Sequence, residues 1–162
     1  MLTREEFKSI FDNNFDIVRN YIYYRCGNTD LATEVAQETF LKLWEKQDSF
    51  KSNNVKGLLY KISGDLFISH YRKQKTRLNY HLQVKSESVQ QNPEEIMQFE
   101  ELQKSYNNVL RLMPEKQRVV FLMHRIDELK YHEMAERLGL SVKAVEKRMK
   151  LAIEFIRKNL NN

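Results

Sequence analysis

The chain has 162 residues and a mass of 19.5 kDa, which is room for one ordinary domain or two small ones. Hydrophobic residues make up 41% of the sequence and charged residues 30%, which excludes global disorder. The net charge of +5 suggests a polyanionic partner, although a modest excess is also common in proteins that bind nothing charged. Only four Gly and two Pro occur, which excludes an all-β sandwich or barrel with a turn about every ten residues.

The first half of the chain is predicted to form three helices. Phe7, Phe11 and Val18 recur at helical spacing, so residues 4–25 read as an amphipathic helix. A turn at 26–29 follows, with Asn28 or Thr29 as the N-cap of a helix that runs to about residue 46. A polar loop at 48–54 then leads into a third helix over about 55–75.

The second half is predicted to form a separate helical set. Residues 78–93 are mostly polar, without periodicity, and read as a linker. Beyond it, one helix carries Leu102 to Met113, and Pro114 begins another that ends near Ile126. The expected fold is therefore all-α, with one small helical domain over 1–77 and another over 94–162.

Residues 131–145 have the pattern of a helix-turn-helix. Ala135 is small where two helices would cross, and Gly139 can adopt the left-handed conformation that ends the first helix. Ser141 can cap the second helix, and Val145 is placed to pack back between the pair. Such a motif inserts its second helix into the DNA major groove.

The second helix of this motif divides into an apolar stripe and a cationic face. Lysine can donate hydrogen bonds to guanine, and a carboxylate can accept one from cytosine. Arginine and lysine elsewhere on the helix suit phosphates, although a solvated lysine face on an ordinary helix is the alternative. The candidate base-reading residues are Lys143, Glu146, Lys147 and Lys150, and the candidate phosphate contacts are Arg148, Arg157 and Lys158.

A second basic zone mixes cations with aromatic residues. Residues 57–81 carry five Lys/Arg against one Asp, and an acidic connector over 82–104 separates them from the basic residues 115–162. Aromatic rings can stack on unpaired bases while cations hold the backbone. Alternatively, Phe67 and half of the tyrosines belong to the core.

Together these segments resemble the extracytoplasmic-function (ECF) sigma factors, a group of bacterial transcription initiation factors. Residues 31–46, LATEVAQETFLKLWEK, are similar to the sigma region 2 helix that docks on core RNA polymerase. Residues 58–73, LLYKISGDLFISHYRK, are similar to the helix that melts and reads the −10 element. Residues 112–126 and 129–155 are similar to sigma region 4, which reads the −35 element.

The resemblance implies a function and a set of contact residues. The chain would bind core RNA polymerase and promoter DNA, and an anti-sigma factor would be a further partner. The implied polymerase contacts are Glu34, Gln37, Glu38 and Lys42. The implied −10 residues are Phe50, Tyr60, Lys61, Asp65, Tyr71, Arg72 and Lys73. The implied −35 residues are Ser141, Lys143, Glu146, Lys147, Arg148 and Lys150.

Asp65 departs from the family pattern, which often has Asn in the −10 pocket. A carboxylate lacks the amide donors and repels phosphate. Asp65 is therefore expected either to read a base with a donor edge or to face away from DNA.

Two other readings of the sequence remain. A helix-turn-helix regulator that is not a sigma factor would need a dimer seam, for which the polar face of the 31–46 segment is poorly suited. A sigma-like decoy that binds only an anti-sigma factor would not need the lysine face of the last helix.

The sequence gives no sign of an enzyme. His132-Glu133 begins like a zinc-binding HExxH motif, but Glu136 stands where the second His would be, so no metal site, catalytic residue or cofactor is expected. The longest apolar run, 119–123, is too short to cross a membrane, and no small-molecule substrate is implied. The single Cys26 is consistent with a reducing cytoplasm.

Overall fold

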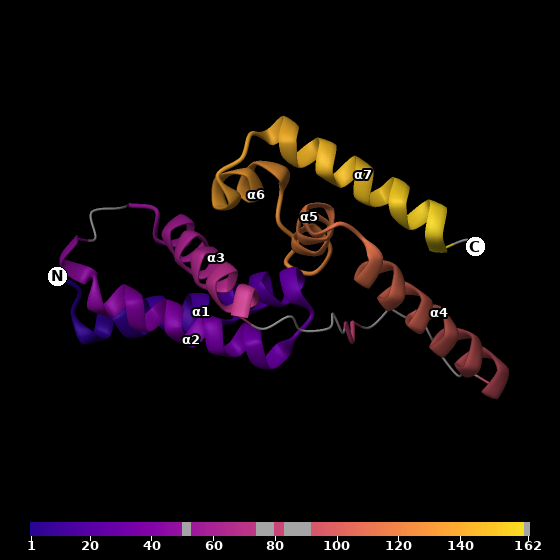
Figure 1. The fold of residues 1–162 in the computed structure, drawn as a ribbon, viewed down its shortest axis with the longest axis horizontal. Helices are drawn as coiled ribbons and strands as arrows, with labels where there is room; N and C mark the ends of the chain where they lie inside the picture. The colour runs from indigo at the N-terminus through magenta and orange to yellow at the C-terminus, as the bar shows by residue number, and fades with distance from the viewer. Residues whose placement is uncertain (50–52, 74–79, 83–91, 161–162) are drawn as a thin grey trace.

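The computed structural model describes residues 1–49, 53–73, 80–82 and 92–160, and within them the chain folds into helices joined by short turns (Figure 1). No strand occurs in these ranges. The all-α fold class predicted from the scarcity of Gly and Pro is confirmed.

In the N-terminal half, residues 1–49 and 53–73 form a bundle of three helices. These are α1 (Arg4–Cys26), α2 (Thr29–Glu45) and α3 (Val55–Lys73), with a short 3-10 turn at Gln47–Ser49. Asn28 caps α2, because its side-chain oxygen accepts a hydrogen bond from the Leu31 amide at 3.0 Å. The bundle core is made by Val18 of α1, Ala36, Phe40 and Leu43 of α2, and Leu59 of α3.

Four helices form within residues 92–160, the described part of the C-terminal half. These are α4 (Pro93–Leu112), α5 (Glu115–Arg125), α6 (Tyr131–Leu138) and α7 (Val142–Leu160). Asn92 caps α4, with Pro93 in its first turn, and Pro114 directly precedes α5. Both prolines therefore stand where a missing amide donor costs nothing.

The two halves pack directly against each other. Helix α5 contacts α1, and α6 contacts α3, so that α5 and α6 lie close to the N-terminal bundle in Figure 1. One continuous apolar cluster includes Tyr24 and Leu31 from the first half and Leu110, Met123 and Val145 from the second. The chain therefore does not hold its halves apart in this structure.

Residues 80–82, which we call the strap, lie between the halves. Tyr80 is buried, and its hydroxyl donates to the Tyr24 carbonyl at 2.8 Å. The Leu82 amide donates to the Asn107 side chain at 3.0 Å, and the Asn107 amide donates back to the Leu82 carbonyl at 3.0 Å. These three residues belong to the linker predicted over 78–93, and they form hydrogen bonds with both α1 and α4.

Candidate functional site

The helix-turn-helix predicted at 131–145 is present. Gly139 ends α6 with φ of 66°, and the Leu140 amide donates to the Ala135 carbonyl at 2.9 Å. The Ser141 hydroxyl accepts from the Ala144 amide at 3.1 Å, so Ser141 caps α7. Ala135 and Val145 are both buried, as the motif requires. The left-handed turn and the cap predicted from the sequence are confirmed.

Helix α7 turns a cationic face to solvent. Val145, Met149 and Ala152 are buried along the opposite stripe, which fixes the rotation of the helix. The four candidate base-reading residues, Lys143, Glu146, Lys147 and Lys150, are all exposed. A single helix thus presents three ammonium groups and one carboxylate on the side that a major groove would meet.

Arg148 lies apart from this cationic face. Its side chain is half-buried, and its charge acts on Tyr21 of α1. Burial raises the pKa of the Tyr21 phenol, while Arg25 and, more weakly, Arg148 oppose the rise. Arg157 and Lys158, near the end of α7, are exposed.

The α3 residues predicted to handle the −10 strand differ in exposure, and they form an exposed group and a buried one. Lys61 and Asp65 are exposed, and Tyr71 is 41% exposed. Tyr60 is only 4% exposed and lies against Tyr21, with ring centroids 4.6 Å apart. In this arrangement Tyr60 is a core residue that no base can reach.

The remaining −10 candidates are only partly described. Arg72 and Lys73 belong to the last turn of α3, but their side chains lie outside the described part of the structure. Phe50 lies outside the described residues altogether. Phe67 is 3% exposed, which confirms the alternative that it serves the core.

The exposed face of α3 borders a cleft that it shares with the helix-turn-helix. The cleft has a volume of about 420 Å³. One wall carries Lys61 and Asp65 of α3, and the other carries Glu136, Arg137 and Gly139 of α6 and its turn. Asp65 therefore faces this cleft, and its carboxylate is available to accept a hydrogen bond.

Helix α2 presents the four predicted polymerase contacts on one side. Glu34 and Gln37 are exposed, whereas Glu38 and Lys42 are half-buried. Glu38 is paired with His70 of α3, at 2.7 Å between carboxylate oxygen and ring nitrogen. These residues thus lie together on α2, and one of them, Glu38, also contacts α3.

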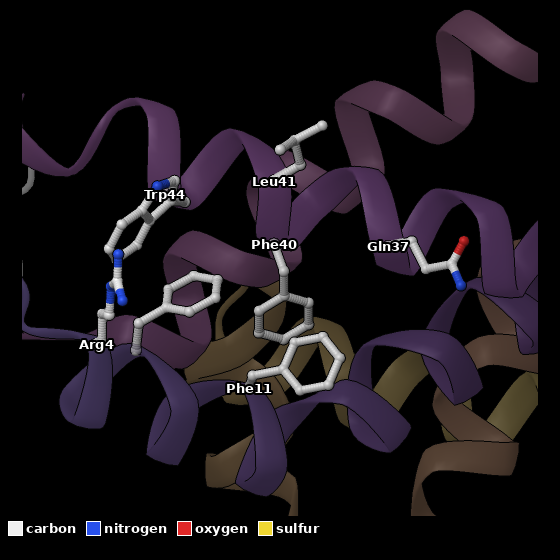
Figure 2. Close-up of a pocket in the computed structure, with 7 residues that line it drawn as sticks. Arg4, Phe11, Gln37, Phe40, Leu41 and Trp44 are labelled. Atoms are coloured by element: carbon white, nitrogen blue, oxygen red, sulfur yellow. The ribbon is translucent and has the colours of Figure 1, made fainter.

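An apolar groove lies beside these polar residues, between α1 and α2 (Figure 2). Its volume is about 400 Å³. Trp44 and Arg4 lie toward one another at one end, and Gln37 lies at the other (Figure 2). The lining residues are Arg4, Phe7, Phe11, Gln37, Phe40, Leu41 and Trp44.

Sequence reasoning missed Leu41 as a candidate contact. Leu41 is 56% exposed and immediately follows Phe40, which is in the core. The sequence alone does not show this exposure, because other neighbouring residues of α2, such as Val35 and Ala36, are both buried. Leu41 lines the same groove as the aromatic residues Phe7, Phe11 and Trp44, so it extends an apolar surface beside the polar candidates.

The described residues contain no group of three or more His, Cys, Asp or Glu side chains placed to hold a metal ion. Burial raises the pKa of the Cys26 thiol to about 11, so this thiol is protonated at neutral pH and is a weak nucleophile. Among the helices that the structure describes, none has the length and apolar character needed to cross a membrane.

Comparison with known families assigns both halves of the chain to one class of protein. Residues 10–77 match the family described as Sigma-70 region 2, and residues 103–156 match Sigma-70, region 4. The chain is thus built from the two regions of a sigma-70-type transcription factor, in the order that the sequence motifs predicted.

Comparison with individual relatives identifies the family within this class. The chain is 30% identical to the ECF RNA polymerase sigma factor SigW of Bacillus subtilis, over 94% of this chain and 89% of SigW. It is 24% identical to the RNA polymerase sigma factor YlaC of the same organism, over 99% of this chain and 95% of YlaC. The protein belongs to the ECF RNA polymerase sigma factors.

Solved structures share the fold. The sigma factor RpoE of Bartonella quintana, solved in complex with the anti-sigma factor NepR, matches with a TM-score of 0.65 at 19% identity, over 97% of this chain and 98% of RpoE. CnrH, solved in complex with the cytosolic domain of CnrY, matches with a TM-score of 0.68 at 19% identity, over 98% of this chain and 90% of CnrH.

Proposed function

We propose that this ECF sigma factor binds core RNA polymerase and directs it to promoters through −10 and −35 elements. The observation that carries the proposal is the combination, on one chain, of a helix-turn-helix with an exposed lysine face and a region 2 helix with an exposed apolar groove. The protein performs no covalent chemistry in this role and acts in the cytoplasm, where core polymerase is.

The −35 element is read by α7. Lys143, Lys147 and Lys150 are free to donate to guanine edges, and Glu146 can accept from cytosine. The exposed Arg157 and Lys158 contact phosphates, which fix the register without reading sequence. Because phosphate contacts release counterions, binding to duplex DNA weakens steeply as salt rises.

The −10 element is handled by α3 and the chain around it. Lys61 holds the backbone, and Tyr71 supplies a ring on which an unpaired base can stack, worth about 1–3 kcal/mol per base. Asp65 accepts a hydrogen bond from a base amino group, so the proposed specificity favours a base with a donor edge. For Arg72, Lys73 and Phe50 the proposed −10 role rests on the resemblance of the sequence alone.

Core polymerase docks on α2. The exposed Glu34 and Gln37, together with Lys42, surround the exposed Leu41 and the groove beneath it. A central apolar contact within a polar rim is the usual composition of a protein interface. Glu38 contributes through its pairing with His70, which fixes the position of α2 relative to α3.

An anti-sigma factor is a further proposed partner. The structural relatives RpoE and CnrH were solved with NepR, an anti-sigma factor, and with the cytosolic domain of CnrY. A protein of that kind would compete with polymerase or DNA for the exposed surfaces of this chain.

In vitro transcription tests the proposal. Purified chain is added to bacterial core RNA polymerase with a library of genomic fragments, and the start sites are sequenced. Start sites that appear only with the chain, and that share −10 and −35 sequences, support the proposal. If the chain never co-elutes with core polymerase and no start site depends on it, the proposal is wrong.

A further inference from the structure

The first half of α4 carries an apolar stripe that the fold leaves partly uncovered. Ile96 and Leu102 are 43% and 44% exposed, and Phe99 between them is half-buried. The three side chains share one side of α4, because residues three apart are neighbours on a helix surface. In Figure 1 the first turns of α4 lie at the edge of the molecule, away from the other helices. The stripe therefore has the composition of a buried helix side, but the described part of a single chain does not bury it.

This stripe runs into an apolar groove between α4, α5 and α7. The groove has a volume of about 370 Å³. Leu102 belongs to both the stripe and the groove, and Ile153 of α7, which also lines the groove, is 37% exposed. The apolar lining residues are Leu102, Tyr106, Phe121, Ile153, Ile156 and Leu160. One chain thus presents an apolar ridge and, directly beyond it, an apolar groove.

The ridge and the groove carry opposite charges. Four carboxylates accompany the stripe in the first half of α4, and no lysine or arginine precedes Lys104 in that helix; they are Glu94, Glu95, Glu100 and Glu101. Both charged residues that line the groove are arginines, Arg125 of α5 and Arg157 of α7, and both are exposed. The surface of the ridge is therefore complementary to that of the groove in charge as well as in apolar character.

A single chain cannot bring this ridge and this groove together. Helix α4 is unbroken from Pro93 to Leu112, and Tyr106 in its second half forms part of the groove. The first half of the helix would have to turn back on the second half to enter it. A second copy meets no such restriction, because a two-fold axis places the ridge of each copy in the groove of the other.

We propose that two copies of this chain form a two-fold symmetric dimer, in which the Ile96–Leu102 ridge of each α4 lies in the α4–α5–α7 groove of the other copy. The axis passes close to Leu102, the residue that ridge and groove have in common, so the two α4 helices cross in antiparallel directions. The dimer makes the same contact twice, and each contact joins an acidic ridge to a groove with two arginines. This assembly is separate from the proposed role in transcription and does not depend on it.

The first test compares two exposed apolar residues of α4 in the full-length chain. Leu102→Ser changes the centre of the proposed contact. Met97→Ser is the matched control, because Met97 is 63% exposed and lies two positions from Phe99, which places it on the other side of the helix. Sedimentation equilibrium between micromolar and millimolar chain concentrations measures the dissociation constant of the dimer.

We expect the average mass of the wild-type protein to rise with concentration toward twice the chain mass of 19.5 kDa. Leu102→Ser should raise the dissociation constant at least about tenfold, as expected for loss of a central apolar contact. Met97→Ser should leave it unchanged. Circular dichroism checks that both variants keep the helical content of the wild type.

A charge exchange between copies tests the pairing of ridge with groove. One variant carries Glu100→Lys and Glu101→Lys, so that its ridge and its groove are both basic. The other carries Arg125→Glu and Arg157→Glu, so that its ridge and its groove are both acidic. Neither variant should dimerise alone, because both contacts become repulsive. A mixture should form a heterodimer, in which both contacts again join opposite charges.

Each result decides the proposal. A wild-type chain that stays monomeric up to millimolar concentration would overturn it and leave the groove to a different occupant. A dimer that Leu102→Ser weakens no more than Met97→Ser does would show that α4 is not the interface. Two charge variants that fail to associate when mixed, or that each dimerise as the wild type does, would exclude the pairing of ridge with groove.

Discussion

Gly139 is the residue on which the geometry of the helix-turn-helix most directly depends. Its φ is 66°, a left-handed conformation that residues with a Cβ rarely adopt. An added Cβ would meet no atom within 4 Å, so space is not the constraint. Replacement of Gly139 therefore costs free energy through backbone conformation alone.

We predict that Gly139→Val lowers the free energy of unfolding by about 2 kcal/mol, because a β-branched residue resists positive φ. Gly139→Asn should lower it by less, since asparagine tolerates the left-handed region. Urea unfolding followed by circular dichroism measures both. Equal midpoints for the wild type and both variants would show that the turn does not need its left-handed residue.

The burial of Arg118 is a feature that the sequence does not reveal. An arginine in the middle of an amphipathic segment is expected to be exposed, since charged residues are rarely buried without partners. Its partners here are main-chain carbonyls of α1 and α4, contributed by residues up to 94 positions away in the chain. No local pattern encodes such partners, so the burial of Arg118 could not have been predicted.

At the scale of helices, periodicity and capping residues predicted most of what the structure contains. The helix over 4–25, the cap at Asn28 and the turn at Gly139 are local features, fixed by side chains within one or two turns of each other. It was harder to predict which residues of each helix are exposed to a binding partner. Tyr60 is buried because α1 and the C-terminal half both approach α3, and that approach is a tertiary event.

For α7 we predict that Lys147→Ala or Lys150→Ala weakens binding to cognate promoter duplex by about 1–3 kcal/mol each. Both side chains are exposed, so the free energy of unfolding should not change. Lys104→Ala, an equal loss of charge at an exposed position of α4, is the control. Electrophoretic mobility shifts at two salt concentrations measure the effect. If both variants bind as tightly as the control does, the lysine face does not contact DNA.

For α2 we predict that Leu41→Ser, alone or with Gln37→Ala, weakens binding to core RNA polymerase by about 1–2 kcal/mol. Leu41 is 56% exposed, so its loss should leave the fold stable, and Leu112→Ser at 55% exposure in α4 is the matched control. Pull-down titration against core polymerase gives the affinity. A Leu41→Ser protein that binds like the control would exclude the groove from the docking surface.

At the scale of the whole molecule, one buried interface joins the two halves of the chain. The apolar cluster that joins the halves includes residues that an open sigma factor would expose, among them Tyr24 and Tyr80. The contact between the halves therefore buries apolar surface, while Lys61 and Asp65 of α3 remain exposed. Hydrogen bonds from Arg118 and the Arg25–Glu115 pair join the halves beside these apolar contacts.

The interface should also respond to alkaline pH. Burial raises the pKa of Tyr60 to about 12, and it raises the pKa of Tyr24 and of Tyr80 further above the usual value near 10. A group with a raised pKa in the folded state contributes stability that is complete below its unfolded pKa. That contribution is lost as pH rises through the folded value. The closed state should therefore weaken from about pH 10 upward.

We predict that these tyrosines ionise in a late phase of a pH titration that is monitored by ultraviolet absorbance. This phase should coincide with an increase in the radius of gyration. Ionised phenolates cannot remain in the contact between the halves, so titration and opening are one event. Tyr80→Phe should diminish the late phase, whereas Tyr71→Phe, which removes an exposed phenol, should leave it intact. A late phase that Tyr80→Phe does not alter, or an opening well below pH 10, would show that these buried phenols do not hold the halves together.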